Sequence, residues 1–400
     1  MRKNILSILM PMVILGPLAI DIYLPSMPIM ATEFNISANQ VQSTIVLFIF
    51  ALGAGQILIG PLADRYGRRP IAIAGISLYI ISSLIAVVAK DFAWLQAARI
   101  LQGIAACASS IVVFSAVRDT FSIKEGARYY SYLNGMICII PALAPTLGGM
   151  LALQFGWRSS FLVMALYATL VLLIVIFRLP ETKPETTDSS GSLYHWARFK
   201  PVLQDAHFLF YAVTCMAGMA AILTYVSYAP TWLINQIGVS EITFSLLFGL
   251  NAAVNIAACF VAPLVIKKQG NRPTVIIALV CLLLSALALF VTQEYGVSAG
   301  LAAAFNFMLP MMLLCIGFAL LLGPATSMAL SSFGERAGTA TAMLGCIQMS
   351  GAALLSGLVQ KIGLSAPNAI ILLISVVSII LLSIMFMSRF NHWHLEQLES

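Results

Sequence analysis

The chain has 400 residues, of which 60% are hydrophobic and only 9% charged, and its formal net charge is +6 at pH 7. Soluble globular domains carry about 25% charged residues, so this composition excludes an ordinary soluble protein and indicates an integral membrane protein. The basic residues form no run with interleaved aromatic side chains, so the positive charge does not indicate nucleic-acid binding.

Apolar runs of roughly 20 residues recur along the whole chain, and a helix of that length crosses about 30 Å of hydrocarbon. The runs do not alternate apolar and polar residues, which excludes a membrane β-barrel. We therefore predict an all-α integral membrane protein. Its twelve transmembrane helices are expected at residues 5–31, 40–63, 70–89, 93–118, 129–153, 158–179, 206–234, 241–266, 273–292, 299–328, 335–361 and 366–388.

The first predicted helix carries one carboxylate, Asp21, inside its apolar run. Burying a carboxylate in a membrane costs several kcal/mol unless the group is paired or protonated, so an acid in this place indicates a function. We expect Asp21 to carry a proton; the alternative is a fixed ion pair that holds helices together. Pro17 and Pro25 predict flexure near Asp21, and Pro28 either adds to it or ends the helix.

The fourth predicted helix carries a matching cation, Arg99. Arg99 and Asp21 both fall in the outer halves of their helices, so they are expected at similar depth. We expect the two residues to couple. The alternative is an arginine that extends to the lipid headgroups.

The chain also contains an internal repeat. The stretch GPLADRYGRRP at residues 60–70 follows the second predicted helix, and APLVIKKQGNRP at residues 262–273 follows the eighth. Six helices lie between these copies, so both face the same side of the membrane. Such a parallel repeat predicts two six-helix bundles related by a pseudo-two-fold axis along the membrane normal. The second copy has Ile266 where the first has Asp64.

The midpoint of the chain is polar and rich in Pro, Ser and Thr, which predicts a linker at residues 180–204 between bundles at residues 1–179 and 205–400. Residues 193–204 are expected to form a short amphipathic helix. Most Lys and Arg residues outside the helices lie at the N-terminus, in alternate connections and in this linker, and the opposite connections hold only Lys90, Arg158 and Lys361. This asymmetry predicts that both termini and the linker are cytoplasmic.

We expect the loop at residues 60–70 to act as a conformational latch, that is, to stabilise one conformation of the protein. Gly60 and Gly67 permit close packing and a tight turn, and Asp64 can cap a helix end or pair with Arg68. Asp119, at the inner end of the fourth helix, is expected to complete a charge network. A pure topology signal would account for the arginines, but not for Asp64 or the glycines.

The fifth predicted helix contains Pro145, Gly148 and Gly149, which allow a bent and closely packed helix. The alternative is ordinary packing of small residues. Polar and aromatic side chains at helical spacing are candidate substrate contacts, although such stripes also serve interhelical packing. These candidates are Tyr225, Tyr228, Trp232, Asn134, Met136, Asn251, Asn255, Asn306 and Gln348.

These motifs resemble those of a known family. The stretch GPLADRYGRRP resembles the signature loop of the major facilitator superfamily, and residues 99–103 (RILQG) resemble its RxxQG motif. Residues 145–149 (PTLGG) are similar to the core of a motif typical of antiporters, with Ala144 in place of the usual preceding glycine. Residues 21–25 (DIYLP), with Pro28 and the Arg118–Asp119 pair, resemble the Bcr/CflA branch of drug:proton antiporters.

The resemblance implies a twelve-helix bacterial inner-membrane exporter that works by alternating access. Such proteins exchange protons for small lipophilic drugs of the chloramphenicol and bicyclomycin type. The resemblance also implies that helices 1 and 4 lie side by side around the cavity, and that the loop network stabilises the outward-open state.

The main alternative is a proton-coupled transporter of a small metabolite such as a sugar or an amino acid. An enzyme is not expected, since the sequence has no Ser–His–Asp order, no HExxH and no paired carboxylates. No cofactor and no metal are expected, because the seven cysteines form no CxxC pair and the histidines have no partners at ligand spacing. The expected partners are drugs, protons and the lipid bilayer, with no nucleic acid, and the protein is expected to be monomeric.

Overall fold

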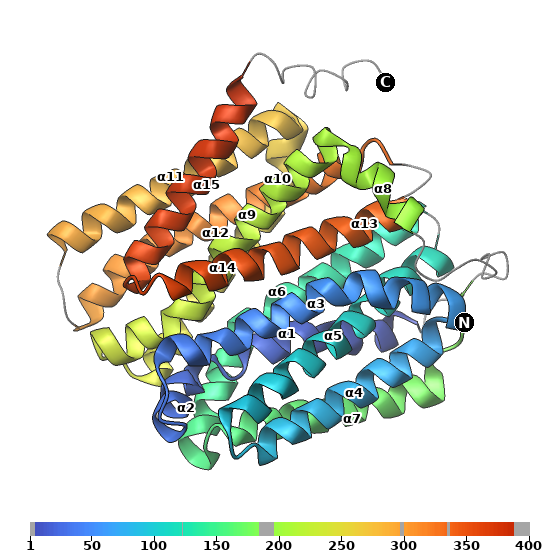
Figure 1. Ribbon diagram of the computed structural model, residues 1–400, viewed down its shortest axis with the longest axis horizontal. Coiled ribbons are helices and arrows are strands. Elements are labelled where there is room, and N and C mark those ends of the chain that lie inside the picture. The colour runs from blue at the N-terminus through green and yellow to red at the C-terminus, as the bar shows by residue number, and fades with distance from the viewer. Residues whose placement is uncertain (1–4, 122, 184–195, 297–299, 334–336, 388–400) are drawn as a thin grey trace. The chain divides into compact units, whose positions relative to one another are not determined.

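A computed structural model describes residues 5–121, 123–183, 196–296, 300–333 and 337–387. Within these ranges the chain forms helices and no strands (Figure 1). Eleven of the helices are long and apolar enough to cross a membrane, and α6 holds a further, shorter apolar stretch at Ile139–Phe155. The predicted all-α membrane fold is confirmed.

The chain divides into two compact units. The first comprises Met1–Trp196 together with Glu241–Gly249, and the second comprises Ala197–Ser240 and Leu250–Ser400. The first unit contains α1 (Leu6–Asp21), η2 (Leu24–Ser26), α2 (Met27–Glu33), α3 (Ala38–Tyr66), α4 (Arg68–Val88), α5 (Phe92–Thr120), α6 (Ile123–Phe155) and α7 (Arg158–Arg178). The start of α10 (Glu241–Gln269) belongs to this unit as well.

The second unit is also helical. It contains α8 (Trp196–Gln204), α9 (Ala206–Pro230), η3 (Thr231–Ile237), the rest of α10, α11 (Asn271–Tyr295), α12 (Gly300–Leu330), α13 (Ala337–Cys346), η5 (Ile347–Gly351), α14 (Ala352–Lys361) and α15 (Ala366–Phe386). The short helix α8 lies within the segment for which an amphipathic helix was predicted. The segments η3 and η5 are π-helical turns, a geometry that is rare and often found at functional sites.

The first predicted helix is interrupted rather than continuous. It runs as α1 to Asp21, passes through η2, and resumes as α2. Pro25 and Pro28 each lie in the first turn of the segment that follows the break, where the missing N–H costs least. Pro17 lies inside the continuous α1, so the helix is broken after Asp21 and not at Pro17.

Close approach of backbones holds α3, α4 and α5 together in the first unit. A Cβ atom added to Gly75 of α4 would lie 2.6 Å from Cβ of Ala108 on α5. A Cβ atom on Gly103 of α5 would clash with the carbonyl oxygen of Phe48 on α3. Small residues allow this packing, which is a main source of helix association in a membrane.

The two copies of the internal repeat have the same backbone geometry. Gly67 joins α3 to α4 with φ 101° and ψ 163°, and Gly270 joins α10 to α11 with φ 86° and ψ 175°. Arg69 Nη2 donates to the carbonyl of Ile176 in the last turn of α7 at 2.9 Å. Its counterpart Arg272 donates in the same way to Met385 in the last turn of α15 at 3.0 Å. The similarity of the two sequences therefore extends to their local structure.

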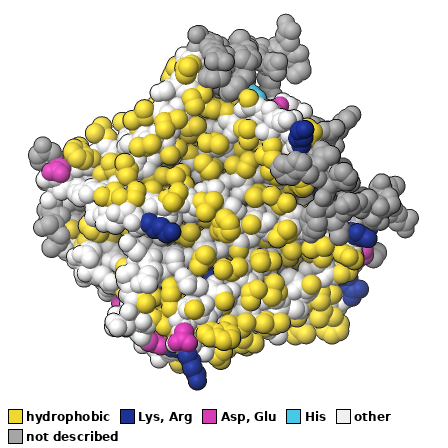
Figure 2. All heavy atoms as spheres, in the orientation of Figure 1, with side chains coloured by type: hydrophobic (Ala, Val, Ile, Leu, Met, Phe, Trp, Pro, Cys, Tyr) yellow, Lys and Arg dark blue, Asp and Glu magenta, His cyan; other side chains and the backbone are white. Residues whose placement is uncertain are grey.

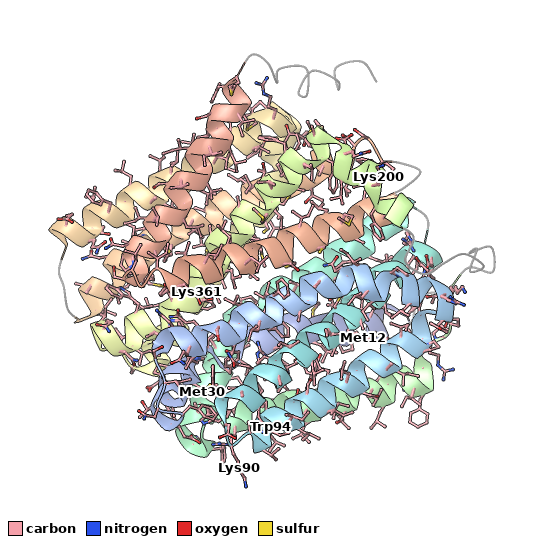
Figure 3. The ribbon with its side chains drawn as sticks, viewed as in Figure 1. Met12, Met30, Lys90, Trp94, Lys200 and Lys361 are labelled. Atoms are coloured by element: carbon pink, nitrogen blue, oxygen red, sulfur yellow. The ribbon has the colours of Figure 1, made fainter. Side chains whose placement is uncertain are left out.

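The exterior is typical of a protein in contact with lipid. Hydrophobic side chains cover much of the face in Figure 2, where charged side chains are few. Trp94, which is 59% exposed, lies close to Lys90 at the turn between α4 and α5 (Figure 3). Tryptophan beside lysine at a helix end is typical of the membrane–water interface.

The Gly103 contact gives a prediction about stability. Gly103→Ala should lower the free energy of unfolding by about 1–3 kcal/mol, because the added methyl group forces α3 and α5 apart. Gly16→Ala is the matched control, since a Cβ atom at Gly16 has no heavy atom within 4 Å. Thermal unfolding of the detergent-purified protein measures both. Equal unfolding temperatures for the two variants would contradict the packing described.

Candidate functional site

Asp21 is buried at the end of α1, with 5% of its surface exposed. No hydrogen bond or ion pair to its carboxylate occurs within the described part of the chain. The carboxyl end of a helix also disfavours negative charge. The protein therefore offers the ionised carboxylate little stabilisation, and protonation removes the cost of burial.

The backbone break after Asp21 is packed against α6 and α7. A Cβ atom on Gly148 of α6 would overlap the carbonyl oxygen of Ile22, so only glycine allows this approach. The Ser160 hydroxyl of α7 donates to the same carbonyl at 3.5 Å. A Cβ atom on Gly149 would lie 3.8 Å from Cβ of Pro25.

The same region of α6 contacts the start of α10. Ser245 donates its hydroxyl to the carbonyl of Pro145 at 3.0 Å and lies 3.3 Å from the position of a Cβ atom on Gly149. A Cβ atom on Gly249 would lie 3.1 Å from the carbonyl oxygen of Ala142. At Pro145, Gly148 and Gly149, α6 thus packs closely against both the break after α1 and the start of α10.

The far end of the interrupted segment is fixed by Glu33. Its carboxylate accepts a hydrogen bond from Trp157 Nε1 at 2.7 Å and forms an ion pair with Arg158. Arg158 also donates to the carbonyl of Ala89 at the end of α4. These contacts tie the end of α2 to α4 and α7.

Arg99 of α5 is completely buried. Its guanidinium carbon lies 4.8 Å from the ring centroid of Tyr23 and 4.4 Å from that of Phe48, which are cation–π distances. Nε donates to the carbonyl of Thr44 at 3.4 Å and Nη1 donates to Gln102. Nη2 has no hydrogen-bond partner among the residues that the structure describes.

The predicted coupling of Arg99 to Asp21 is not a direct contact in this structure. Neither an ion pair nor a hydrogen bond joins them in the described residues. Tyr23 lies two residues after Asp21, stacks under Arg99, and its hydroxyl shares a hydrogen bond of 3.0 Å with the Thr44 hydroxyl. Tyr23 thus connects the guanidinium to the segment that follows Asp21.

The predicted charge network of the loop is present. Arg68 is buried and pairs with Asp64 at 2.8 Å and with Asp119 at 2.9 Å, and Arg118 pairs with Asp119 at 3.2 Å. The Asp64 side chain is 56% exposed and that of Asp119 only 5%. The expectation of close packing is wrong for Gly60, where an added Cβ atom would meet no heavy atom within 4 Å.

Glu181 completes this site from the segment that follows α7. Its carboxylate accepts the backbone N–H groups of Arg68 at 2.8 Å and Arg69 at 3.1 Å, and so caps the first turn of α4. It also accepts those of Thr182 and Lys183. Burial alone would raise the pKa of Glu181, but these four donors outweigh it and hold the pKa below its ordinary value of 4.5.

In the second unit the structure brings Tyr225 of α9 and Asn251 of α10 together. Asn251 Nδ2 donates to the Tyr225 hydroxyl at 3.0 Å, and its Oδ1 is buried without a hydrogen-bond partner in the described residues. Asn255 Oδ1, one turn further along α10, is also buried and unpartnered there. Buried amide oxygens without partners are costly, and a bound ligand could satisfy them.

The other predicted contacts are more dispersed. Tyr228 packs in a separate cluster with Ala352 and Leu373, and Trp232 packs against this cluster from the π-helical turn η3. Gln348 lies in the other π-helical turn, η5. Asn306 packs beside Gly296 at the end of α11. Met136 is partly buried in α6, and the Asn134 side chain falls outside the described part of the structure.

A family model described as the Major Facilitator Superfamily matches residues 9–356. The chain belongs to the major facilitator superfamily. It is also 33% identical over 378 residues to a protein named Multidrug resistance protein MdtL from Escherichia coli O157:H7, and the alignment covers 94% of each chain. These findings identify a transporter and a multi-pass inner-membrane protein.

Solved structures show the same superfamily fold. The chain is similar to a POT family transporter in complex with 5-aminolevulinic acid, with a TM-score of 0.79 and 14% identity over 96% of this chain and 94% of that one. It is also similar to a D-xylose-proton symporter, with a TM-score of 0.75 and 15% identity over 95% and 97%. At these identities the likeness shows the fold alone.

Sequence reasoning missed three members of the site. Tyr23 and Phe48 stack on Arg99, but an aromatic residue in an apolar helix carries no signal of that role. Glu181 was assigned to the linker, although the short PET stretch directly after α7 placed an acid near the arginine-rich loop. Two of its partners, Arg68 and Arg69, lie more than 100 residues away in sequence, so only the fold reveals that contact.

The cap on α4 gives a prediction with a defined pH dependence. Glu181→Gln should lower the free energy of unfolding at pH 7 by about 1 kcal/mol, the usual size of a lost helix cap. Because the folded pKa is depressed, the contribution of Glu181 is complete above pH 4.5 and is lost as the pH falls through the lower folded pKa.

The difference in unfolding temperature between wild type and Glu181→Gln should therefore shrink between pH 7 and pH 3. Glu294→Gln, at the exposed end of α11, is the control and should behave as wild type throughout. A difference that is constant over this pH range would contradict the role of the ionised carboxylate.

The Gly148 contact gives a second prediction. Gly148→Ala should displace the carbonyl of Ile22 and expose the break, so amide hydrogen exchange at residues 22–27 should become at least tenfold faster. Gly149→Ala should have a much smaller effect, because its added methyl group meets the Ser245 hydroxyl at 3.3 Å and comes no closer than 3.7 Å to a backbone atom, the carbonyl oxygen of Glu241. Equal exchange in the two variants, measured by mass spectrometry, would show that α6 does not hold the break.

Proposed function

We propose that this protein is a proton-coupled multidrug exporter. It would move small lipophilic drugs of the chloramphenicol and bicyclomycin type out of the cytoplasm in exchange for protons. The buried, unpartnered Asp21 beside a helix break carries the proposal. The 33% identity to a multidrug resistance protein supports the export of drugs.

In the proposed cycle Asp21 takes up a proton on one side of the membrane and releases it on the other. The neutral acid tolerates a dry, occluded position, and the ionised acid requires water or a cation. We assign to Arg99 the role of sensing the change, because Tyr23 links its guanidinium to the segment that follows Asp21. Displacement of this stack would let the free Nη2 reach an anionic or carbonyl group.

Alternating access requires contacts that hold one state against the other. We assign this role to the network of Arg68, Asp64 and Asp119, which would stabilise the outward-open state from the cytoplasmic side. The distribution of basic residues supports cytoplasmic termini. We also propose that the protein has two six-helix halves joined by a cytoplasmic linker. It would act as a monomer.

Substrates would contact the second unit at Tyr225 and Asn251, where an unpartnered amide oxygen is available. Trp232 and Gln348, in the two π-helical turns, are further candidates. Methionine and aromatic side chains near these positions suit ligands of varied shape. A small metabolite remains the second candidate substrate, and the experiment below separates the two.

Proton exchange by Asp21 can be tested in inside-out vesicles that are acidified by respiration and loaded with a lumenal pH dye. Chloramphenicol and other drugs should release protons from wild-type vesicles. Asp21→Asn vesicles should lose at least nine-tenths of this response, because the amide cannot carry a proton. Asp91→Asn, an exposed acid at the start of α5, should respond as wild type.

Each result has a defined meaning. If no drug moves protons in wild-type vesicles, drug export fails and the metabolite candidate takes its place. If wild type and Asp21→Asn respond equally, export stands but Asp21 has a structural role only.

A further inference from the structure

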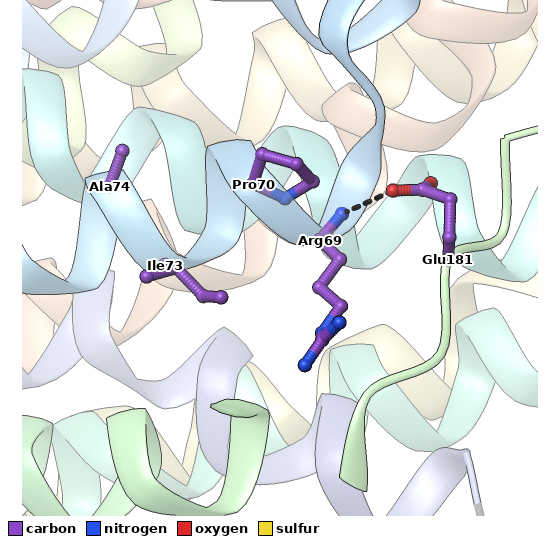
Figure 4. A pocket seen from close by; sticks show the side chains of 5 residues that line it. All are labelled: Arg69, Pro70, Ile73, Ala74 and Glu181. Carbon is purple, nitrogen blue, oxygen red and sulfur yellow. Dashed lines mark hydrogen bonds between the residues drawn. The ribbon is translucent and has the colours of Figure 1, made fainter. Parts of the chain in front are cut away.

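An open groove lies on the first unit where α4 meets the segment after α7 (Figure 4). Its volume is about 440 Å³. The lining residues are Arg69, Pro70, Ile73, Ala74 and Glu181. Three of the five are apolar residues of α4. Arg69 lies in the first turn of that helix, and Glu181 meets this turn from the segment after α7.

The guanidinium group of Arg69 has hydrogen-bond donors that are not used within the described residues. Nη2 donates to the carbonyl of Ile176, and the other guanidinium nitrogens have no partner among the described residues. No carboxylate lies within ion-pair distance of Arg69 in this part of the protein. The side chain is thus positioned by one hydrogen bond and keeps an uncompensated positive charge beside the groove.

Glu181 does not neutralise this charge by a direct pair. Its two oxygens accept four backbone N–H groups, including those of Arg68 and Arg69. Lys183 adds another cation close by, because its ammonium group donates to the carbonyl of Arg65 at 2.9 Å. The charged end of the groove therefore suits an anion.

The apolar end of the groove continues along the exposed face of α4. Ile81, Leu84 and Val88 follow Ala74 at intervals that place them on one side of the helix, and they are 53%, 44% and 71% exposed. This helix has 21 residues and is therefore about 31 Å long, the thickness of the hydrocarbon layer. An acyl chain that starts at the groove can lie against this face.

We propose that the groove binds an anionic phospholipid of the bilayer, with its headgroup phosphate on Arg69 and an acyl chain over Pro70, Ile73 and Ala74. Arginine binds phosphate through several N–H donors in one plane, and the groove presents those donors at the membrane surface. Bound there, the lipid also packs against the residues that carry the Glu181 cap. This inference requires only that the chain spans a membrane and does not depend on the transported substrate.

Native mass spectrometry of the full-length protein in detergent can test this. The protein would be titrated with dioleoyl phosphatidylglycerol, or with phosphatidylcholine or phosphatidylethanolamine of the same chains. Wild type should bind one phosphatidylglycerol molecule at least fivefold more tightly than either zwitterionic lipid, the effect expected of one interfacial cation. Arg69→Gln should remove this preference.

Two further variants separate the site from general electrostatics. Arg178→Gln removes an exposed arginine at the end of α7 that does not line the groove, and it should keep the preference. Ala74→Phe fills the apolar end without changing the charge, and it should weaken phosphatidylglycerol binding severalfold.

Three results would overturn the proposal. The first is equal binding of the three lipids to wild type, and the second is an unchanged preference in Arg69→Gln. In the third, Arg178→Gln loses the preference as fully as Arg69→Gln does, which would show a general attraction to the basic surface. Unfolding temperatures equal to that of wild type would show that the variants are folded.

Discussion

A helix break inside a membrane needs protein around it, because lipid offers no hydrogen bonds to an exposed backbone. The break after Asp21 meets this condition through Gly148, whose lack of a side chain lets α6 cover the carbonyl of Ile22. The Ser160 hydroxyl adds a donor, and Glu33 fixes the far end of the segment. The break after Asp21 can therefore form only because α6 has a glycine at the position that covers it.

The first unit handles its buried charges in two different ways. Near the loop, Arg68 forms ion pairs with two carboxylates, those of Asp64 and Asp119. In the middle of α5, Arg99 has only aromatic faces, a carbonyl and an amide around it. Paired charges favour one fixed arrangement, whereas a guanidinium held by rings can change partners at lower cost. This contrast agrees with the two proposed roles, in which the Arg68 network holds one conformation and Arg99 responds to a change at Asp21.

Much of this fold could be predicted from the sequence, since membrane helices are specified by long apolar runs. Most helix bounds lie within three residues of those predicted, although α6 begins six residues earlier and three of the predicted helices are divided by η2, η3 or η5. The charge network of Arg68 follows from the loop motif. The contacts that depend on tertiary packing could not be predicted. Gly60 looks like a packing residue and has open space around it, whereas Glu181 looks like part of a linker and caps a helix. Side chains such as Asn306 cannot be assigned to a cavity from helical spacing, because depth along the helix also decides what they touch.

The second copy of the loop has the same glycine conformation and the same arginine-to-carbonyl bond, yet it has Asn271 in place of Arg68 and no acid in place of Asp64. One molecule thus contains an internal comparison that normally requires mutagenesis. The second copy keeps Lys267, Lys268 and Arg272, and it shows that the turn forms without the Asp64 carboxylate and the Arg68 guanidinium. The pairs of Arg68 with Asp64 and Asp119 are therefore not needed for the shape of the turn, and what they add is a link between the ends of α3, α4 and α5.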